Sequence, residues 1–281
     1  MRCQWDALLS VLPNRIRPDV DKYQNELLLE IRLRIGQPPI LIFPAMEDML
    51  EGNVTLNEIN QCIHYATRYS PWTATTQAQG YITAPGGHRI GICGTYVEGE
   101  SGPVIREPSM LCIRIARDIS EISNGLEDKQ GSILILGRPG CGKTTLLRDL
   151  IRQYSLQRRG TICVVDEREE IFPKQNGQFC FFPGPRTDVL SGCNKAKGIT
   201  MVLRNMTPSV IAVDEITHKD DCEAIIQAGW CGAELYATVH ARDIKDLHTR
   251  PIYRSLIQTG IFQNYVVLGA DKRWHLERVS L

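Results

Sequence analysis

Residues 137–145 read GRPGCGKTT and follow the apolar run ILIL. The pattern G-x-x-x-x-G-K-[ST] fits this stretch, between a predicted strand and a predicted helix. Glycines in such a loop let backbone N–H groups wrap phosphates, and the helix N-terminus adds its positive end. Lys143 would reach the β- and γ-phosphates, and the Thr144 hydroxyl would hold Mg²⁺. The alternative is a glycine-rich turn that only joins a strand to a helix.

The sequence therefore predicts ATP and Mg²⁺ as ligands. The residues expected to hold the nucleotide are Gly137, Arg138, Pro139, Gly140, Cys141, Gly142, Lys143, Thr144 and Thr145.

Hydrolysis needs side chains beyond this loop, and the run VIAVDE provides candidates. It ends in Asp214, where a carboxylate that serves Mg²⁺ belongs, and Glu215 follows, placed to polarise an attacking water. The alternative for an acidic pair at the end of a strand is a solvated edge or a helix cap. We assign Thr144 and Asp214 to Mg²⁺, and Lys143 and Glu215 to catalysis.

Two more predicted strands end in polar residues. His240 closes ATVH and can sense a γ-phosphate if its strand lies beside the phosphate-loop strand; otherwise it is a partly exposed histidine. VVDEREE, at 164–170, clusters four acids around Arg168. Because the carboxyl ends of parallel strands meet at one edge of a sheet, Asp166 and Glu167 can face the crevice that Asp214 faces. The alternative is a solvated acidic loop.

An arginine near the transferred phosphate accelerates phosphoryl transfer by roughly 10³ to 10⁵. Each candidate here is more often a surface or salt-bridged residue, and spacing alone leaves the choice open. The candidates are Arg186 and Arg204 between the second and third predicted strands, and Arg89, Arg106, Arg114 and Arg117 nearer the N-terminus.

Apolar runs alternate with helical segments in the C-terminal part of the chain. A helix is expected after the phosphate loop up to Gly160, and HKDDCEAIIQAGWCG predicts another. Strands with helices between them predict a parallel sheet covered on both faces. The expected strands are 132–136, 161–167, 209–215, 233–240, 264–269 and the terminal RWHLERVSL.

The first 125 residues follow a different pattern. EIRLRIG alternates charged and aliphatic residues as a half-buried strand does, and Thr55 and Glu58 have the spacing of a helix capping box. QGYITAPGGHRIGICGTYV predicts two strands around the turn PGGH, and SMLCIRIARDI predicts another strand. We therefore expect an α/β protein: a P-loop core with a parallel sheet at 126–281, preceded by a smaller α+β domain at 1–125, with a linker at 120–131.

Composition excludes several classes of protein. Lys plus Arg equals Asp plus Glu, at 32 each in 281 residues, so no bulk charge draws the chain to nucleic acid. No apolar run approaches the roughly 20 residues that span a bilayer, and the N-terminus is a poor signal peptide. The ten cysteines stand singly, without zinc-finger spacing. We expect a cytoplasmic protein with no nucleic-acid partner.

Several motifs, in this order and spacing, resemble the stage III sporulation protein AA family of endospore-forming bacteria. They are GRPGCGKTTLLRD, VVDEREEI, GPRTDVLSGCNKA, VIAVDEI and ATVHARD, with EIRLRIGQPP and ITAPGGHRIGICGTYV in the first domain. The resemblance spans nearly the whole chain, and GPRTDVL and GGHRIGI carry most of its specificity.

That family is similar to the ATPases of type II and type IV secretion, which implies a RecA-like P-loop core. In such a core the strand ending in His240 lies between the phosphate-loop strand and the strand ending in Asp214, which favours His240 as a γ-phosphate sensor. VVDEREEI stands where those ATPases carry an acidic box, which favours Asp166, Glu167 and Glu170 as site residues. Of these, Glu167 is assigned to catalysis. Basic residues of the first domain complete such sites, and Arg114 and Arg117 are the leading candidates.

The resemblance also implies a biological setting. Such ATPases form hexameric rings, so a homo-oligomer is expected. The family powers a channel between mother cell and forespore, which implies membrane proteins of that channel as partners. The chain would then be cytoplasmic and reach the membrane only through those partners.

Three functions remain to be distinguished. The main expectation is an ATP-hydrolysing motor. A nucleic-acid-dependent ATPase, such as a helicase or its loader, also uses a RecA-like core. A scaffold in which ATP binding only drives assembly is the third, although such a protein has no need of Glu215.

Overall fold

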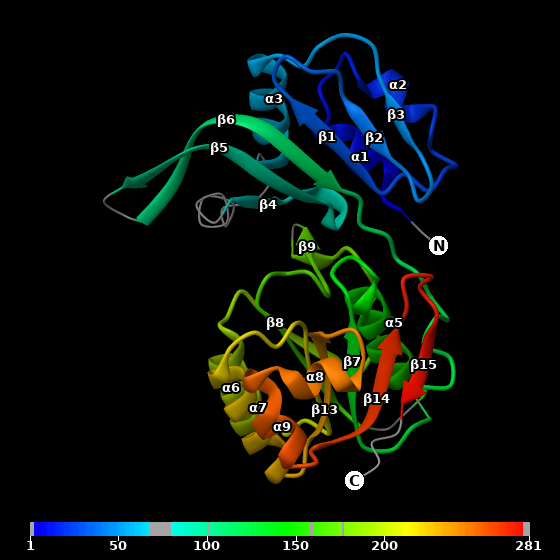
Figure 1. The fold of residues 1–281 in the computed structure, drawn as a ribbon, viewed down its shortest axis with the longest axis vertical. Helices are drawn as coiled ribbons and strands as arrows, with labels where there is room; N and C mark the ends of the chain where they lie inside the picture. Colours follow the sequence, from blue (N-terminus) through cyan, green and yellow to red (C-terminus); the bar gives the residue numbers. More distant parts are fainter. Residues whose placement is uncertain are drawn as a thin grey trace. The chain divides into compact units, whose positions relative to one another are not determined.

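The computed structural model describes residues 3–67, 80–99, 102–126, 128–157, 160–175 and 177–277. The chain divides into two compact units, each with its own large sheet (Figure 1). The first unit is Met1–Asp118 with Pro173–Cys180, and the second is Ile119–Phe172 with Phe181–Leu281. The boundary predicted from sequence is residue 125, and the sequence carries no sign that 173–180 belongs to the first unit.

The first unit is built on a six-stranded antiparallel sheet of order β3-β2-β1-β6-β5-β4. Its strands are β1 (Glu30–Arg34), β2 (Ile40–Ile42), β3 (Glu47–Met49), β4 (Tyr81–Thr83), β5 (Arg89–Gly99) and β6 (Gly102–Arg114). Its helices are α1 (Trp5–Val11), α2 (Arg17–Asp21), α3 (Leu56–Thr67) and the 3₁₀ turn η1 (Pro85–Gly87). The short hairpin of β9 (Lys174–Gln175) and β10 (Gln178–Phe179) also belongs to this unit.

Local sequence explains these elements. In β1, Ile31 and Leu33 are buried and the charged residues between them are not, as the alternation predicted. Before α3, the Thr55 N–H donates to Glu58 Oε2 at 2.8 Å, and the Glu58 N–H donates to Thr55 Oγ1 at 3.2 Å. The predicted capping box is therefore confirmed. The apolar faces of α1, α3 and the sheet share one buried cluster.

The turn PGGH joins β4 to β5, as predicted, and its histidine is buried. Gly86 and Gly87 both have φ of +76°, a conformation that favours glycine. The neutral ring of His88 fills the space behind the turn: Nδ1 accepts the Ala116 N–H at 3.1 Å, and Nε2 donates to the Gln4 carbonyl at 3.1 Å. The imidazole thereby ties the turn to the N-terminus and to the end of the sheet.

The second unit holds a seven-stranded sheet of order β11-β8-β12-β13-β7-β14-β15. All neighbours are parallel except the pair β14 and β15. Its strands are β7 (Ser132–Gly137), β8 (Ile162–Asp166), β11 (Thr187–Ser191), β12 (Val210–Val213), β13 (Glu234–His240), β14 (Phe262–Leu268) and β15 (Trp274–Glu277). Its helices are α5 (Lys143–Gln157), α6 (Lys195–Asn205), α7 (Lys219–Trp230), α8 (Ile244–Thr249), α9 (Arg254–Gln258) and the 3₁₀ turn η2 (Pro251–Tyr253).

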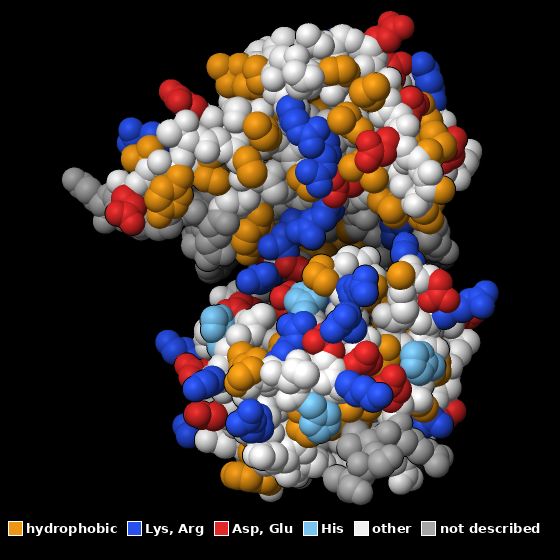
Figure 2. All heavy atoms as spheres, in the orientation of Figure 1, with side chains coloured by type: hydrophobic (Ala, Val, Ile, Leu, Met, Phe, Trp, Pro, Cys, Tyr) orange, Lys and Arg blue, Asp and Glu red, His pale blue; other side chains and the backbone are white. Residues whose placement is uncertain are grey.

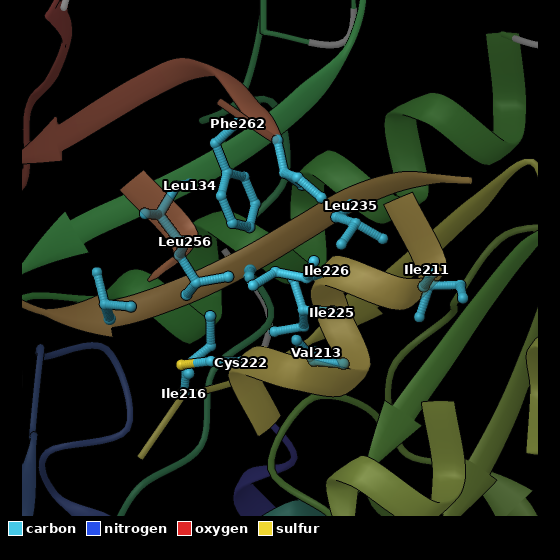
Figure 3. Close-up of a cluster of buried hydrophobic side chains, with 14 of the residues drawn as sticks. Leu134, Ile211, Val213, Ile216, Cys222, Ile225, Ile226, Leu235, Leu256 and Phe262 are labelled. Carbon is cyan, nitrogen blue, oxygen red and sulfur yellow. The ribbon is translucent and has the colours of Figure 1, made fainter. Parts of the chain in front are cut away.

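Helices cover both faces of this sheet, and the side chains of each strand alternate between two layers. On one face, α7 and α9 pack against the strands through an apolar cluster that includes Val213, Ile225 and Phe262 (Figure 3). On the other face lies α5, where Tyr154 meets Tyr236 of β13 edge to face at 5.8 Å. The fold is a RecA-like α/β core, as expected.

Some elements were not predicted. TDVLS forms the edge strand β11 by pairing in parallel with β8, although its polar residues give a weak strand signal. The segment between β13 and β14, with α8, η2 and α9, was also missed. Of the predicted terminal strand, 274–277 pairs with β14, and 278–281 lies outside the described residues. Among the helices of the described ranges, none has the length and apolar character needed to span a bilayer.

Candidate nucleotide site

The phosphate-loop motif occupies the turn between β7 and α5, so the strand and helix predicted on either side of it are confirmed. Gly140 and Gly142 have φ of +76° and +106°, which side chains rarely allow. A Cβ on Gly137 would lie 2.5 Å from Cys141 Sγ, so the loop folds tightly over the end of its own strand. Backbone strain and close packing both explain why glycine is used at these positions.

Lys143 is buried, and its ammonium group is turned inward. Nζ donates to the carbonyl oxygens of Gly137 at 3.0 Å and Arg138 at 3.1 Å, and it lies 2.8 Å from Nδ1 of His240. Loss of hydration on burial lowers the pKa of Lys143 from its usual value. The lysine is therefore held in the loop by acceptors that a phosphate oxygen can replace.

Two hydroxyl groups converge on Asp214, which follows β12. The Thr144 hydroxyl donates to Oδ2 at 2.7 Å, and the Thr238 hydroxyl donates to Oδ1 at 2.5 Å. Thr144 lies in the first turn of α5, and Thr238 lies in β13, the strand next to β12. Asp214 is thus fixed from both sides, and its carboxylate with the Thr144 hydroxyl offers hard oxygen ligands of the kind Mg²⁺ prefers.

Glu215 has a left-handed backbone, with φ of +36°, which is unusual for a residue other than glycine. Its N–H donates to Thr238 Oγ1 at 2.8 Å, and its carbonyl accepts from Lys195 Nζ at 2.9 Å. Its carboxylate oxygen Oε1 lies 2.9 Å from His240 Nε2. The surrounding hydrogen bonds hold this strained conformation, and the conformation turns the carboxylate toward β13.

His240 therefore joins the phosphate-loop lysine to Glu215. Because the Lys143 ammonium can only donate, Nδ1 must accept from it, which places the ring proton on Nε2. The Nε2–H group then donates to the Glu215 carboxylate. This arrangement requires β13 to lie between β7 and β12, and the sheet has that order.

Asp166 and Glu167, at the end of β8 and directly after it, have different surroundings. Asp166 is buried and accepts the N–H groups of Glu170, Ile171 and Phe172 at 2.8 to 3.0 Å, so it organises its own loop. Burial raises the pKa of Asp166 to about 7, although the three N–H donors favour its ionised form. Glu167 is partly exposed and lies 3.3 Å from Lys195 Nζ.

A polar cavity of about 80 Å³ lies beside these groups, at the carboxyl ends of β8 and β12. It has room for a few water molecules. The predicted convergence of the acidic segment with the VIAVDE pair is seen here, because Asp166, Glu167, Asp214 and Glu215 all line it.

The candidate arginines have different surroundings. Arg117 donates through Nη2 to the carbonyl oxygens of Glu26 at 3.2 Å and Leu28 at 2.9 Å, within its own unit. Arg114 is exposed at the end of β6, opposite Glu30 and Arg89 of the adjacent strands. Lys and Arg side chains gather over β1 on the face shown in Figure 2. The roles of Arg114 and Arg117 stay predictions.

Of the other arginines, Arg186 donates to the Ser155 carbonyl at 3.1 Å and anchors the segment before β11. Arg204 is exposed in the last turn of α6.

Sequence reasoning missed two residues of this site. Thr238 was hidden inside an apolar strand, and its only signal is the alternation that puts it on the same face as His240. Lys195 stands at the start of a helix far along the chain, and nothing in its neighbourhood indicated that it reaches the acidic groups.

Comparison with known proteins agrees with this architecture. The family model of sporulation stage III protein AA matches residues 4–276. The chain belongs to this family. It is 33% identical over 282 aligned positions to stage III sporulation protein AA of Bacillus subtilis (strain 168), covering 95% of this chain and 92% of that protein.

Two solved structures show the same fold at low identity. The ATPase DotB of Yersinia pseudotuberculosis has a TM-score of 0.62 at 15% identity, covering 96% of this chain and 79% of its own. The pilus retraction motor PilT with bound ADP has a TM-score of 0.61 at 15% identity, covering 89% and 76%. This member of the sporulation family therefore shares the fold of the ATPase DotB and of the pilus retraction motor PilT.

Proposed function

We propose that this chain hydrolyses ATP and uses the energy to drive a sporulation assembly. The observation that carries the proposal is the line of contacts from Lys143 through His240 to Glu215. These contacts connect Lys143, which would bind phosphate, with the Glu215 carboxylate, which could activate a water. A protein that only binds a nucleotide needs the first of these residues but not the last.

Each residue has a distinct task in this proposal. Lys143 binds the β- and γ-phosphates, and His240 responds when the lysine exchanges its imidazole contact for a phosphate oxygen. Glu215 then orients a water and accepts its proton, as a general base does. Glu167, which also lines the 80 Å³ cavity, helps to hold that water.

Mg²⁺ would be held by Thr144 and Asp214. The residues fit the ion, because their two oxygens lie 2.7 Å apart and a third group, the Thr238 hydroxyl, orients the carboxylate from behind. When bound, Mg²⁺ supplies positive charge that stabilises the transferring phosphoryl group.

An arginine from the first unit completes the site in this proposal. Arg114 is the better candidate because its side chain is exposed, whereas the Arg117 guanidinium is already bonded to two carbonyl groups. Such an arginine can come from the same chain or from a neighbouring copy. A hexameric ring, as expected for secretion-type ATPases, would provide either arrangement.

The assembly we propose is a channel between mother cell and forespore, with membrane proteins as partners. The chain would work in the cytoplasm and reach the membrane through them. Similarity over nearly the whole chain to the sporulation stage III protein AA family supports the sporulation setting. Balanced charge, 32 basic against 32 acidic residues, argues against nucleic acid as the driven substrate.

Phosphate release from the purified chain, with ATP and Mg²⁺ and across a range of protein concentrations, tests the proposal. Lys143→Ala is the blank. We expect release above the blank, with a specific activity that rises as the oligomer forms. If release is no greater than the blank at every concentration and the bound ATP stays intact, the motor hypothesis is rejected in favour of an assembly scaffold. Stimulation by single-stranded DNA with a steep salt dependence would instead indicate a nucleic-acid-dependent ATPase.

A further inference from the structure

Lys195 is buried at the first position of α6, where two effects oppose a cation. The N-terminus of a helix is the positive end of its dipole, which disfavours a lysine there. Burial removes the hydration of the ammonium group as well. The first turn of α6 has no acidic side chain that would offset these costs. A local conflict of this kind is expected mainly where a residue has a function.

Oxygen atoms from three separate segments surround the ammonium group. Nζ donates to the Glu215 carbonyl at 2.9 Å and to Glu167 Oε2 at 3.3 Å, and it lies 3.9 Å from Asp221 Oδ2. Asp221 in turn accepts the N–H groups of Thr217 and His218, which follow Glu215. One cation thus connects the acidic segment after β8 with the whole loop between β12 and α7.

The packing of α6 fixes where this lysine reaches. Gly198 follows Lys195 by one turn, and a Cβ on Gly198 would lie 2.4 Å from Cγ1 of Val165. The helix therefore lies flush against β8, so that its first residue extends over the carboxyl edge of the sheet. A glycine inside a helix is destabilising relative to alanine, and here the close approach of α6 to β8 explains its use.

We infer that Lys195 is a positioning residue for Glu215, and this inference rests on the proposed function. The ammonium group holds the Glu215 carbonyl while Thr238 and Asp214 hold its N–H. With both ends of the residue fixed, the left-handed backbone persists and the carboxylate points at His240. Lys195 also lines the 80 Å³ cavity, but in this role it acts through the glutamate.

Two substitutions and a neighbouring control test the inference. Lys195→Met keeps the length of the side chain without its charge or donors, and Lys195→Arg restores both. Lys197→Met changes an exposed lysine in the same helical turn. For each, kcat for phosphate release, KM for ATP and the midpoint of urea unfolding are measured on the full chain.

We expect Lys195→Met to lower kcat by about tenfold to a hundredfold, as misplacement of a catalytic group does, while KM for ATP changes by less than about threefold. Lys195→Arg should recover part of the loss, and Lys197→Met should behave as wild type. Wild-type kcat in Lys195→Met would overturn the inference. So would a parallel fall in kcat, ATP affinity and unfolding midpoint, because that pattern describes a purely structural lysine.

A second readout separates this inference from the proposed function. NMR of the imidazole nitrogens reports the ring tautomer of His240, with the signal assigned through His240→Gln. In the wild type the proton should sit on Nε2, with the Nε2–H group bonded to Glu215. In Lys195→Met the contact with Lys143 should keep that tautomer, whereas the Nε2–H signal should shift as Glu215 moves away and this hydrogen bond is lost. If the wild type releases no phosphate, the ATPase proposal fails, and the shift of the Nε2–H signal still decides the role of Lys195. An unchanged His240 spectrum in Lys195→Met would contradict the positioning role of Lys195.

Discussion

Nδ1 of His240 lies 2.8 Å from Nζ of Lys143, so a strand-end histidine directly contacts the phosphate-loop lysine. The lysine ammonium donates to two loop carbonyls and to the imidazole, and the imidazole in turn donates to Glu215. A phosphate that draws the lysine away therefore changes the surroundings of the glutamate. In the proposed ATPase, this link would let the site sense the γ-phosphate.

His240→Ala should retain ATP binding and lose hydrolysis by about tenfold to a hundredfold, because the glutamate loses its anchor. The hydrolysis rate of His240→Gln, whose amide has both a donor and an acceptor, should lie between those of the wild type and His240→Ala. Phosphate release and the anisotropy of a fluorescent ATP analogue measure the two properties. Equal losses of binding and hydrolysis would mean that the histidine only supports the loop.

Glu215→Gln should bind ATP as the wild type does but hydrolyse it about a hundredfold or more slowly, because an amide cannot accept a proton from water. The exposed Glu223 on α7 offers a control, and Glu223→Gln should be fully active. The measurement is the nucleotide recovered after long incubation. We expect ADP from the wild type and the control, and ATP from Glu215→Gln. Turnover at the wild-type rate in Glu215→Gln would remove the glutamate from catalysis.

Thr238→Val should raise the Mg²⁺ concentration needed for half-maximal ATPase activity by about tenfold, as loss of groups that orient metal ligands does. Valine matches threonine in shape and suits a strand, so the fold should be retained. The change removes the hydroxyl that donates to Asp214 and accepts the Glu215 N–H. A Mg²⁺ titration of phosphate release measures the effect. Thr249→Val, at an exposed position, is the control, and identical titrations for the two variants would contradict the role of Thr238.

His88 should make the stability of the first unit depend on pH. Burial lowers the pKa of His88 to about 4, below the 6.5 of an exposed histidine. The folded state therefore prefers the neutral ring: the stabilisation is complete above pH 6.5 and is lost as pH falls from 6.5 toward 4. The full difference corresponds to about 3 kcal/mol of unfolding free energy.

Urea unfolding of the full chain between pH 7.5 and 4.5 measures this dependence. The wild type should lose stability over that range, and His88→Gln should be less stable but lose less of its stability as pH falls. His64 lies exposed on α3, and His64→Gln should keep the wild-type slope. The same slope in both variants would assign the pH dependence to other groups.

The two motifs that carried most of the family resemblance turn out to be structural. In GGHRIGI, the histidine joins the turn to Gln4 and Ala116. In GPRTDVL, Arg186 is bonded to Ser155 through its backbone N–H and its guanidinium, at 2.8 and 3.1 Å. A Cβ on Gly184 would lie 2.4 Å from Ser155 Oγ, so the segment passes close over α5. The contacts described here for these motifs are structural, whereas the proposed chemistry rests on the shorter motifs at the strand ends.

The sequence by itself determined the class of fold and the main chemical groups. Apolar runs that end in Gly137, Asp214 and His240 place polar side chains at one edge of a parallel sheet, because hydrophobic periodicity and the phosphate-loop pattern are local properties. Which strands are neighbours is not local, and only the family resemblance indicated in advance that β13 lies between β7 and β12.

Tertiary structure decided what depends on contacts between distant segments. Strand order brings His240 within reach of both Lys143 and Glu215, and it turns Thr238 toward Asp214. The flush packing of α6 on β8 carries Lys195 to a loop twenty residues away. The hairpin at 173–180 joins the first unit although it lies within the second in sequence. Such contacts depend on the free energy of the whole packed chain, so no short window of sequence contains them.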